Sequence, residues 1–436
     1  GPTVEENILK SIEFAKSSGK RFLLGHALDI AEEIKFRLKN LSEVSKIEIA
    51  GSLRRKKETI GDIDILITSK NPKKVMDFFT GMEDVKDVLA KGITKSAVRL
   101  NGGIQADLRV LDEKSYGAAL LYFTGNVQHN IALRKIAIKK GMKLSEYGIF
   151  NTKTNKMLAG KTEGECYKTL GLRYIEPEIR EDEGEIEAAQ KNKLPELIKY
   201  EDLKGDLQMH TKWSDGSNTI IGMANAAIKL GHEYICITDH TGNLKIANAL
   251  DEKRIKKQRK EIDKLNDEIR NFKILQGTEV NIKNDGTLDM KDNVLKEFDI
   301  VLAAIHSGFK NSKEKITQRL AKAMENKHVD IIAHPFGRLI NTRPAYEMDF
   351  DKILEKAKET NTILEINAYP ERLDLSDINV RAAIKAGVKL SIGTDAHEAN
   401  ELRYYTLGIA TARRGWAEKK DIINSHTLND MVKFLK

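Results

Sequence analysis

The chain has 436 residues, of which 40% are hydrophobic and 32% charged, with a formal net charge of +8. This length predicts about two to four domains with cores of their own, and the composition excludes a disordered or low-complexity protein. Because the sequence has no run of about 18 apolar residues, no secretory signal and only two cysteines (Cys166 and Cys236), we expect a cytoplasmic protein without a membrane span or a disulfide scaffold.

The first 175 residues mix helical and strand patterns and carry more basic than acidic residues. Such a surface favours a polyanionic partner, and a merely solvated lysine-rich surface explains it equally well. The run Asn101-Gly102-Gly103 is a hairpin turn signal, so the strands on either side of it should pair. The predicted helices are 4–17, 25–38 and 130–140, and the predicted strands are 47–50, 63–67, 98–100 and 105–110.

An acidic segment separates this region from the rest of the chain. Residues 176–185 are dominated by glutamate, and Pro195 and Gly205 follow shortly after them. Charge runs with proline and glycine are typical of solvated linkers. We therefore expect an acidic linker, and with it the domain boundary, over 176–202.

Residues 203–436 alternate short apolar strands with helices. Regular βα alternation over a region of this size favours a parallel, barrel-like α/β domain. The predicted strands are 234–238, 273–277, 300–305, 331–333, 362–366 and 389–392, and the helices between them include 220–230, 253–272, 314–326 and 350–360.

Two aspartates, Asp62 and Asp64, stand in a predicted strand shortly after a Gly-Ser pair. Alternation within a strand places both on one face, where their repulsion is about 4 kcal/mol at about 4 Å and an effective dielectric of about 20. A divalent cation turns that repulsion into a binding site, and Asp107 on a neighbouring strand would add a third carboxylate. Asp-x-Asp alone more often marks a turn or a strand edge, but with the nearby Gly-Ser it predicts a two-metal phosphoryl-transfer site.

Groups suited to phosphate lie next to these acids. The hydroxyl of Ser52 and the backbone of Gly51 and Ser52 could hold phosphate oxygens. The guanidinium of Arg55 could neutralise a triphosphate as a bidentate fork.

Four segments together resemble the polymerase beta, or X, family of DNA polymerases: Gly51-Ser-Leu-Arg-Arg55, Gly61-Asp-Ile-Asp64, Asp107 and Tyr122-Phe-Thr-Gly125. The first two are shared by many nucleotidyltransferases, whereas the last is more specific. The resemblance implies an α+β palm at 21–110 and a thumb at 111–175, preceded within 1–20 by the last helix of a fingers region. It implies that Asp62 and Asp64 bind both metals, Mg²⁺ or Mn²⁺, and that Asp107 joins the metal that activates the primer 3′-hydroxyl.

The same resemblance implies contacts to an incoming dNTP. Ser52, Arg55 and Arg21 would hold the triphosphate, and Tyr122 and Phe123 would pack beneath the sugar and exclude a 2′-hydroxyl; ordinary core packing is the alternative for these two rings. Asn130 would contact the minor-groove edge of the base, and Arg134 would reach the template side. The full set of expected nucleotide contacts is Arg21, Gly51, Ser52, Arg55, Tyr122, Phe123, Gly125, Asn130 and Arg134.

Five histidines after residue 203 stand at or just after strand ends. One such histidine is more often a satisfied polar residue, but the strand ends of a βα barrel converge on one face, so five of them with interleaved acids predict a metal cluster. Imidazoles and carboxylates without cysteine suit Zn²⁺, Mn²⁺ or Fe²⁺, whose bound water can attack a phosphodiester. The five are His210, His240, His306, His334 and His397.

These motifs resemble the PHP (polymerase and histidinol phosphatase) family, which implies a distorted (β/α)₇ barrel over 203–436 with two or three metals. The family's first motif is usually His-x-His, whereas this chain has Gln208-Met209-His210. Glutamine is a weak neutral ligand, so it would weaken one metal position or shift its preference toward Mn²⁺; we expect activity to persist because the other positions match. The implied ligands are Gln208, His210, Asp215, His240, Glu279, His306, His334, Asp395 and His397.

Two arginines, Arg338 and Arg343, follow one of these motifs closely. We hypothesise that they bind substrate phosphates, and a role in surface salt bridges is equally compatible with the sequence.

A polymerase-X palm and thumb followed by a PHP barrel is the layout of bacterial and archaeal X-family DNA polymerases. The resemblance implies gap-filling DNA synthesis in base-excision repair from dNTPs on gapped or primed DNA, with a 3′→5′ exonuclease and an abasic-site endonuclease in the barrel. We expect a monomer associated with the nucleoid. A small-molecule phosphoesterase with an inactive transferase module and a non-catalytic DNA scaffold stay open as alternatives, although the complete ligand sets argue against both.

Members of this family begin with a helix-hairpin-helix DNA-binding region. The opening Gly1-Pro2 is typical of the residues left after tag cleavage. We therefore expect the natural chain to begin upstream.

Overall fold

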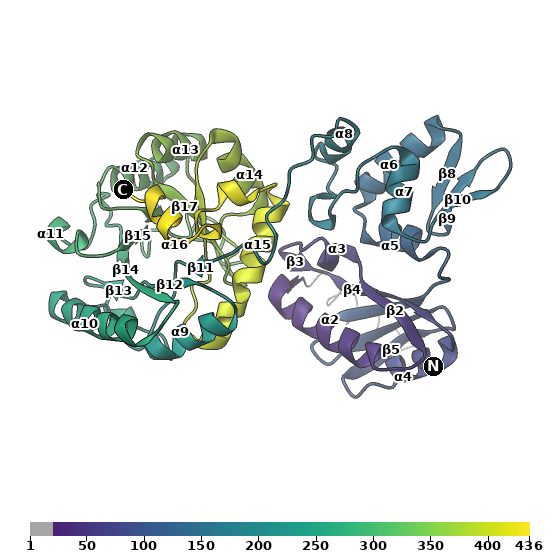
Figure 1. The fold of residues 1–436 in the computed structure, drawn as a ribbon, viewed down its shortest axis with the longest axis horizontal. Coiled ribbons are helices and arrows are strands. Elements are labelled where there is room, and N and C mark those ends of the chain that lie inside the picture. The colour runs from purple at the N-terminus through teal and green to yellow at the C-terminus, as the bar shows by residue number, and fades with distance from the viewer. Residues whose placement is uncertain (1–20) are drawn as a thin grey trace, which may run out of the picture. The chain divides into compact units, whose positions relative to one another are not determined.

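A computed structural model describes residues 21–436 of the chain, so the helix predicted over 4–17 lies outside the described residues. The chain forms two compact units, Gly1–Leu194 and Pro195–Lys436 (Figure 1). None of the helices in the described residues combines the length and the apolar character needed to cross a membrane.

The first unit contains a five-stranded sheet in the order β2-β4-β7-β6-β5. Strand β4 pairs in parallel with the central strand β7 and antiparallel with β2. The predicted hairpin is confirmed by the antiparallel pairing of β6 with β7. The short strands β1 and β3 pair separately. The strands are β1 (Phe22–Leu23), β2 (Val44–Ile49), β3 (Thr59–Ile60), β4 (Asp62–Ser69), β5 (Val85–Lys91), β6 (Lys95–Leu100) and β7 (Gln105–Val110).

Hydrophobic spacing explains how the helices of this part attach to the sheet. Helix α2 (Leu24–Lys39) buries Ala27, Ala31, Ile34 and Leu38, which recur every three or four residues and so share one face. Helix α4 (Pro72–Thr80) begins where the Asn71 side chain accepts a hydrogen bond from the backbone of Lys74. The predicted helix over 25–38 is thereby confirmed as α2.

Helices dominate the remainder of the first unit, together with one small antiparallel sheet in the order β10-β9-β8 (Figure 1). The helix predicted near 130–140 is present and starts slightly earlier, because Asn126 caps it by accepting from the backbone of His129. The elements are α5 (Tyr116–Thr124), α6 (Val127–Lys139), β8 (Met142–Ser145), β9 (Gly148–Asn151), β10 (Met157–Ala159), α7 (Glu163–Leu170) and α8 (Glu185–Gln190).

The acidic segment differs from the predicted solvated linker. Arg180 and Glu185 are fully buried, although the sequence places them in a strongly charged run. Arg180 donates to Glu163 at 2.6 Å, and the Glu185 carboxylate lies 2.6 Å from Nδ1 of His129. Residues up to the end of α8 therefore belong to the first unit, because their charges have partners inside it.

The second unit is a nearly closed barrel of seven parallel strands, which confirms the predicted α/β fold. The strand order is β11-β12-β14-β15-β16-β17-β18, and the short β13 pairs with β14. The strands are β11 (Gly205–Asp206), β12 (Tyr234–Ile237), β13 (His240–Thr241), β14 (Lys273–Asn281), β15 (Ile300–Ala304), β16 (Ile331–Ile332), β17 (Ile363–Asn367) and β18 (Leu390–Gly393).

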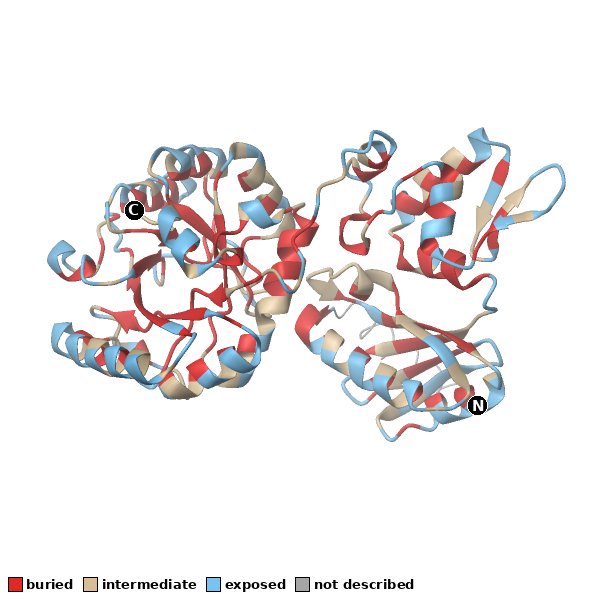
Figure 2. Ribbon diagram, in the orientation of Figure 1, coloured by how far each residue is buried: buried red, intermediate tan, exposed pale blue. Residues whose placement is uncertain are grey.

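Helices surround the barrel, with their exposed faces outward and the buried strands inside (Figure 2). Five of them begin at a Ser, Thr or Asp side chain that accepts a backbone N–H of the first turn, so the sequence fixes where each starts. The helices are α9 (Ile220–Lys229), α10 (Glu252–Glu268), α11 (Asp292–Leu295), α12 (Lys313–Met324), α13 (Phe350–Glu359), α14 (Asp377–Ala386), α15 (Tyr405–Arg414) and α16 (Leu428–Met431).

Side chains join the two end strands of the barrel, β11 and β18. The Asn424 amide donates to the carbonyls of Gly205 and Ile392 at 2.7 and 2.8 Å and accepts from the Ile392 backbone. The Asp206 carboxylate accepts from the backbone and hydroxyl of Thr394. This seam holds the polypeptide on either side of it, and with it His210 and Asp395, close together.

Candidate active sites in the palm and in the barrel

Strand register brings three aspartates of the first unit together. Asp64 on β4 stands directly opposite Asp107 on β7, and Asp62 lies on the same face as Asp64, two residues earlier. Asp107 accepts a hydrogen bond from Gln105 at 2.8 Å and pairs with Lys95 at 3.0 Å. The structure thus places the three predicted catalytic acids on one face of the sheet.

Mutual repulsion marks this group as a cation site. Burial and the neighbouring charges of Asp62 and Asp107 raise the pKa of Asp64 to about 7. Burial, followed by the charge of Asp107, also raises the pKa of Asp62. Carboxylates that are this costly to ionise together gain most from a divalent cation between them, so oxygen ligands of this kind fit Mg²⁺ or Mn²⁺.

Gly51 is required by the close approach of its turn to these acids. Its backbone has a φ of +65°, and a Cβ at this position would lie 2.6 Å from Oδ2 of Asp64. The turn is also tied to β4 by a hydrogen bond from the Ala50 backbone to the Asp64 carbonyl at 2.8 Å. The Gly51-Ser52 backbone is therefore held against the acidic face, where the sequence predicted phosphate contacts.

The two arginines expected at the triphosphate have protein partners here. Arg55 donates from Nε to Glu181 at 3.1 Å and also donates to the Thr124 carbonyl. Arg21 donates from Nε to the Thr59 hydroxyl at 2.8 Å, and its charge favours the ionised form of Asp62. The Glu181 contact could not be read from the sequence because 126 residues separate it from Arg55.

The residues expected around the sugar and base lie on the two successive helices α5 and α6 and between them. The Tyr122 and Phe123 rings meet edge to face, with centroids 5.1 Å apart, and Tyr122 is partly exposed. The Asn130 amide donates to the Tyr122 carbonyl at 2.7 Å, and Nε of Arg134 donates to the Asn130 carbonyl at 3.3 Å. Gly125 ends α5 with a φ of +71°. Tyr122, Asn130 and Arg134 line one small pocket.

In the barrel, Glu279 lies at the centre of the predicted ligands. It stands on β14, which extends beyond the predicted strand end, and its side chain is fully buried. Its Oε1 lies 2.9 Å from Nε2 of both His306 and His334. Its Oε2 lies 3.3 Å from Nε2 of His210 and 3.9 Å from Nδ1 of His240. One carboxylate therefore gathers four imidazoles from different strand ends.

A second acid, Asp215, faces the outer part of the same cluster. Its carboxylate oxygens lie 3.9 Å from Nδ1 of His210, 3.7 Å from Nε2 of His240 and 3.6 Å from Nε2 of His397. The His210 ring stacks on those of His240 and His397, with centroids 4.5 Å apart in each pair. Asp395 completes the cluster, with its Oδ1 3.2 Å from Nε2 of His210.

Imidazoles compensate the acids of this cluster. Burial alone would raise the pKa of Glu279, but the charge of His240 and the imidazoles hydrogen-bonded to Glu279 hold it well below its usual value. Burial likewise opposes ionisation of Asp215, yet a hydrogen bond from His397 and the charges of the neighbouring imidazoles lower its pKa to about 2. These acids stay ionised, as metal ligands must.

The donor set fits divalent cations. Donor atoms converge within 4.8 Å in three overlapping groups. The Nδ1 atoms of His210, His240, His306 and His334 are buried without a hydrogen-bond partner, so each ring retains binding capacity. Neutral imidazoles with carboxylates suit Zn²⁺, Mn²⁺ or Fe²⁺. The three groups are His210, Asp215, His240 and His397; His240, Glu279 and His306; and His210, Glu279 and Asp395.

Sequence reasoning missed three residues beside Asp395. The Asn367 amide donates to Oδ2 of Asp395 at 3.2 Å, and Nε of Arg372 pairs with the same oxygen at 3.2 Å. Glu365 is fully buried, and burial, followed by the charge of Asp395, raises its pKa well above the usual value. A signal was present, because Glu365 near the end of the predicted strand 362–366 and Asn367 just after it put polar residues at a strand end, as the histidine motifs do.

A further acid that the sequence analysis passed over, Asp239, braces the cluster from behind. Its carboxylate accepts from the backbone and hydroxyl of Thr211 at 2.7 Å and from the hydroxyl of Ser214 at 2.6 Å. It also accepts from the Gln258 amide of α10 at 2.6 Å. Asp239 thereby ties the loop that carries His210 to the strand end and to a helix of the outer layer.

Arg338 and Arg343 both contact neighbouring backbone in the structure. Arg338 donates from Nε to the Arg372 carbonyl at 2.8 Å and also donates to the Leu373 carbonyl. Arg343 donates to the Gly337 carbonyl at 3.1 Å, and its guanidinium stacks 4.1 Å from the Phe309 ring centroid. Phosphate binding by these two arginines stays a prediction, and a further arginine, Arg372, pairs with the predicted ligand Asp395 at 3.2 Å.

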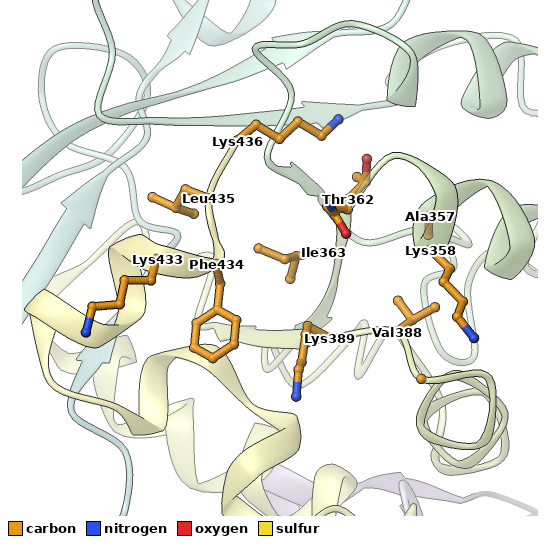
Figure 3. Close-up of a pocket in the computed structure, with 12 residues that line it drawn as sticks. Ala357, Lys358, Thr362, Ile363, Val388, Lys389, Lys433, Phe434, Leu435 and Lys436 are labelled. Atoms are coloured by element: carbon orange, nitrogen blue, oxygen red, sulfur yellow. The ribbon is translucent and has the colours of Figure 1, made fainter.

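A cavity of about 380 Å³ lies elsewhere in the barrel (Figure 3). It is lined at the beginnings of β17 and β18 by Ile363 and Lys389, whereas the histidine cluster lies at the strand ends. Lys358 and Lys433 also line it. The cavity is therefore separate from the metal-binding face.

Similarity to known domain families identifies the class of protein. Residues 26–137 match the DNA polymerase beta palm, 119–181 the DNA polymerase beta thumb and 206–369 the PHP domain. A palm and thumb of this type joined to a PHP barrel define a polymerase with a second phosphoesterase unit.

The chain belongs to the X family of DNA polymerases, in the group that carries a PHP domain. It is 44% identical over its whole length to the DNA polymerase/3′-5′ exonuclease PolX of Bacillus subtilis strain 168, and it covers 76% of that protein. About half of the chain is also similar to smaller proteins. It is 33% identical over 215 residues to a "probable phosphatase" of Thermoanaerobacter sp. strain X514 and 27% identical over 241 residues to one of Syntrophotalea carbinolica, covering 78% and 95% of those proteins.

Proposed function

We propose that this chain is a template-directed DNA polymerase that fills short gaps in base-excision repair, and that its barrel is a metal-dependent 3′→5′ exonuclease. The observation that best supports the polymerase is the shared face of Asp62, Asp64 and Asp107 beside the Gly51 turn. Full-length similarity to a protein named for both activities supports their union in one chain. The proposed substrates are gapped or primed DNA and dNTPs.

In the palm, the three carboxylates would hold Mg²⁺ or Mn²⁺, and the cation would supply positive charge for an in-line phosphoryl transfer. The turn at Gly51 and Ser52 would hold phosphate oxygens, since its backbone is fixed against β4. Arg55 would exchange its contact with Glu181 for the triphosphate, and this exchange would couple nucleotide binding to movement of the segment after α7. Asn130 and Tyr122 would meet the base and sugar.

In the barrel, Zn²⁺, Mn²⁺ or Fe²⁺ would neutralise phosphate charge and acidify water. The Asp215 and His397 side chains are 31% and 35% exposed, whereas those of His210 and Glu279 are fully buried. A DNA end would therefore approach over Asp215 and His397. The same site would also cleave at abasic positions, where the phosphodiester chemistry is unchanged.

Single substitutions separate the two activities. On a gapped duplex with a labelled primer in Mn²⁺, Asp62→Ala should abolish extension with dNTPs and leave primer shortening without dNTPs intact. His210→Ala should do the reverse. If either substitution removed both activities in a folded protein, the two-site proposal would be wrong.

The barrel alone also admits a phosphatase function, because relatives named "probable phosphatase" match it. Hydrolysis of p-nitrophenyl phosphate, compared with that of a labelled oligonucleotide by the same preparation, distinguishes the two. A preference for the small monoester would favour the phosphatase. We further propose that the chain acts as a monomer, which light scattering would check.

A further inference from the structure

The amide orientation of Gln208 is fixed by a chain of hydrogen bonds. The backbone N–H of Tyr369 donates to Oδ1 of Asn367 at 3.1 Å, so the amide nitrogen of Asn367 must point the other way. That nitrogen donates to Oε1 of Gln208 at 3.3 Å, to Oε2 of Glu365 at 3.3 Å and to Oδ2 of Asp395 at 3.2 Å. Because the Asn367 amide nitrogen is a donor, Gln208 must turn its side-chain oxygen, and not its nitrogen, toward Asn367.

The amide nitrogen of Gln208 consequently faces the cluster. It donates to Oε2 of Glu279 at 2.9 Å, the oxygen that also lies 3.3 Å from Nε2 of His210. Hydrogens of an NH₂ group carry positive charge and offer no lone pair, so they repel a cation at this point. Turning the amide over would set the NH₂ groups of Gln208 and Asn367 against each other.

Packing prevents Gln208 from moving aside. Its side chain is fully buried, and even a methyl group at Gly393 would approach its Cβ within 2.8 Å. Its backbone is held at both ends, since its N–H donates to Asp206 at 3.1 Å and its carbonyl accepts from Asp395 at 3.0 Å.

The guanidinium of Arg372 places a fixed positive charge beside Asp395. Nε of Arg372 lies 3.2 Å from Oδ2 of Asp395. Arg338 holds the segment in place by donating to the Arg372 carbonyl at 2.8 Å. Asp395 therefore has a cationic partner in the protein itself.

We propose that this barrel holds two tightly bound cations instead of three, and that Gln208, Asn367 and Arg372 replace the third at the corner formed by His210, Glu279 and Asp395. The two remaining positions are the group of His240, Glu279 and His306 and the group of His210, Asp215, His240 and His397. His334 lies beside the first of these groups, with its Nε2 2.9 Å from Oε1 of Glu279. Gln208 is thus a hydrogen-bond donor and not a metal ligand, contrary to the expectation from the sequence. This inference rests on the proposed metal-dependent function of the barrel.

Counting ions tests the inference directly. The full chain with Asp62→Asn and Asp64→Asn, which removes ions from the palm, is loaded with Zn²⁺, passed through gel filtration and analysed by elemental mass spectrometry. We expect two Zn²⁺ per chain with Gln208 and three after Gln208→His, which restores a second imidazole. His306→Ala should lower the count to one and so verifies the sensitivity of the method.

A second variant covers the case in which Gln208→His does not fold. Asn367→Asp replaces the donor that orients Gln208 with an acceptor, so the amide should turn, present its oxygen to the cluster and raise the count to three. Three retained Zn²⁺ in the Gln208 protein would overturn the inference, as would a count of two in both variants when circular dichroism shows them folded. DNA cleavage is measured separately on the same protein. Two bound ions without DNA cleavage would refute only the proposed function of the barrel. DNA cleavage with three bound ions would refute only the inference about the ion count.

Discussion

The palm and the barrel each gather carboxylates for cations, but they balance the charge differently. In the palm, Lys95 and Gln105 contact Asp107, and the pKa of Asp64 rises to about 7 through burial and its acidic neighbours. In the barrel, imidazoles surround Glu279 and lower its pKa despite burial. The protein itself therefore compensates the acids of the barrel more fully than those of the palm.

A third group of charges, in the first unit, shows what a purely structural arrangement looks like. The buried Glu163 accepts from both terminal nitrogens of Arg54 at 2.9 and 2.7 Å and from Arg180 at 2.6 Å. Burial opposes its ionisation, but the two arginines lower its pKa to about 2. An acid with two arginine partners has no need of a metal, because the arginines already balance its charge.

The largest expected effect comes from a substitution that disables the barrel site alone. Glu279→Gln removes the charge that four imidazoles share, so primer degradation should fall by at least about 100-fold, the upper range for lesser changes around a metal. Time courses on a labelled primer without dNTPs measure this loss. Primer extension by the same variant serves as the control, and an equal fall in extension would show that the two sites are not separate.

The next effect tests the structural acid. Glu163→Gln leaves Arg180, which is fully buried, with a weaker partner, and we expect the first unit to lose about 3 kcal/mol of unfolding free energy. Urea unfolding followed by circular dichroism measures it, with the exposed Glu165→Gln on the same helix as the matched control.

The pH dependence of this stabilisation has a definite sign. Because the pKa of Glu163 is lowered to about 2, its contribution is complete above the ordinary value of 4.5 and disappears as the pH falls toward 2. Equal losses for Glu163→Gln and Glu165→Gln would contradict the assignment.

A smaller expected effect is the difference between the two sites in their stabilisation by Zn²⁺. Zn²⁺ at about 100 times its dissociation constant for the barrel should stabilise the barrel by about 2.7 kcal/mol and stabilise the first unit less. Hydrogen exchange resolved by peptide locates the protection, and EDTA should reverse it. Protection confined to residues of the palm would show that Zn²⁺ stabilises the palm and not the barrel, contrary to the prediction.

The smallest effect sharpens the view of the palm acids. With a pKa of about 7, Asp64 in the metal-free fold binds its proton more tightly than in the unfolded chain, so its ionisation destabilises the fold as the pH rises from about 4 through 7. Asp64→Asn should therefore raise the melting temperature by about 2–4 °C at pH 8, corresponding to about 1 kcal/mol after solvent screening, and leave it unchanged near pH 4.

A melting scan at both pH values measures this difference. Saturating Mg²⁺ should abolish it at pH 8, since the cation compensates Asp64 in the parent protein. A rise of the same size at both pH values would point to packing instead of charge.

Local pattern was enough for most of the fold. Strand alternation predicted that Asp62 and Asp64 share a face, and the hairpin signal at Asn101-Gly102-Gly103 predicted the pairing of β6 with β7. The acidic segment was the exception, because the charge pattern cannot show that Arg180 and Glu185 find buried partners among distant residues.

The sites show the same limit. Motif residues could be placed at strand ends, but the contacts of Arg55 with Glu181 and of Arg372 with Asp395 depend on side-chain geometry between separate segments. The orientation of Gln208 depends on Tyr369 and Asn367 in another strand and loop. Residue type gave the chemistry of each site, and only the assembled neighbours show which oxygen or nitrogen faces inward.

Asp239 has a practical consequence for anyone who purifies this protein. By bracing the loop of His210 against a strand and a helix, it holds the predicted ligand cage in place from outside. A cage that needs little rearrangement exchanges its contents slowly, since release requires several bonds to open at once. The elements found in a fresh preparation will then reflect the growth medium of the cells more than the assay buffer.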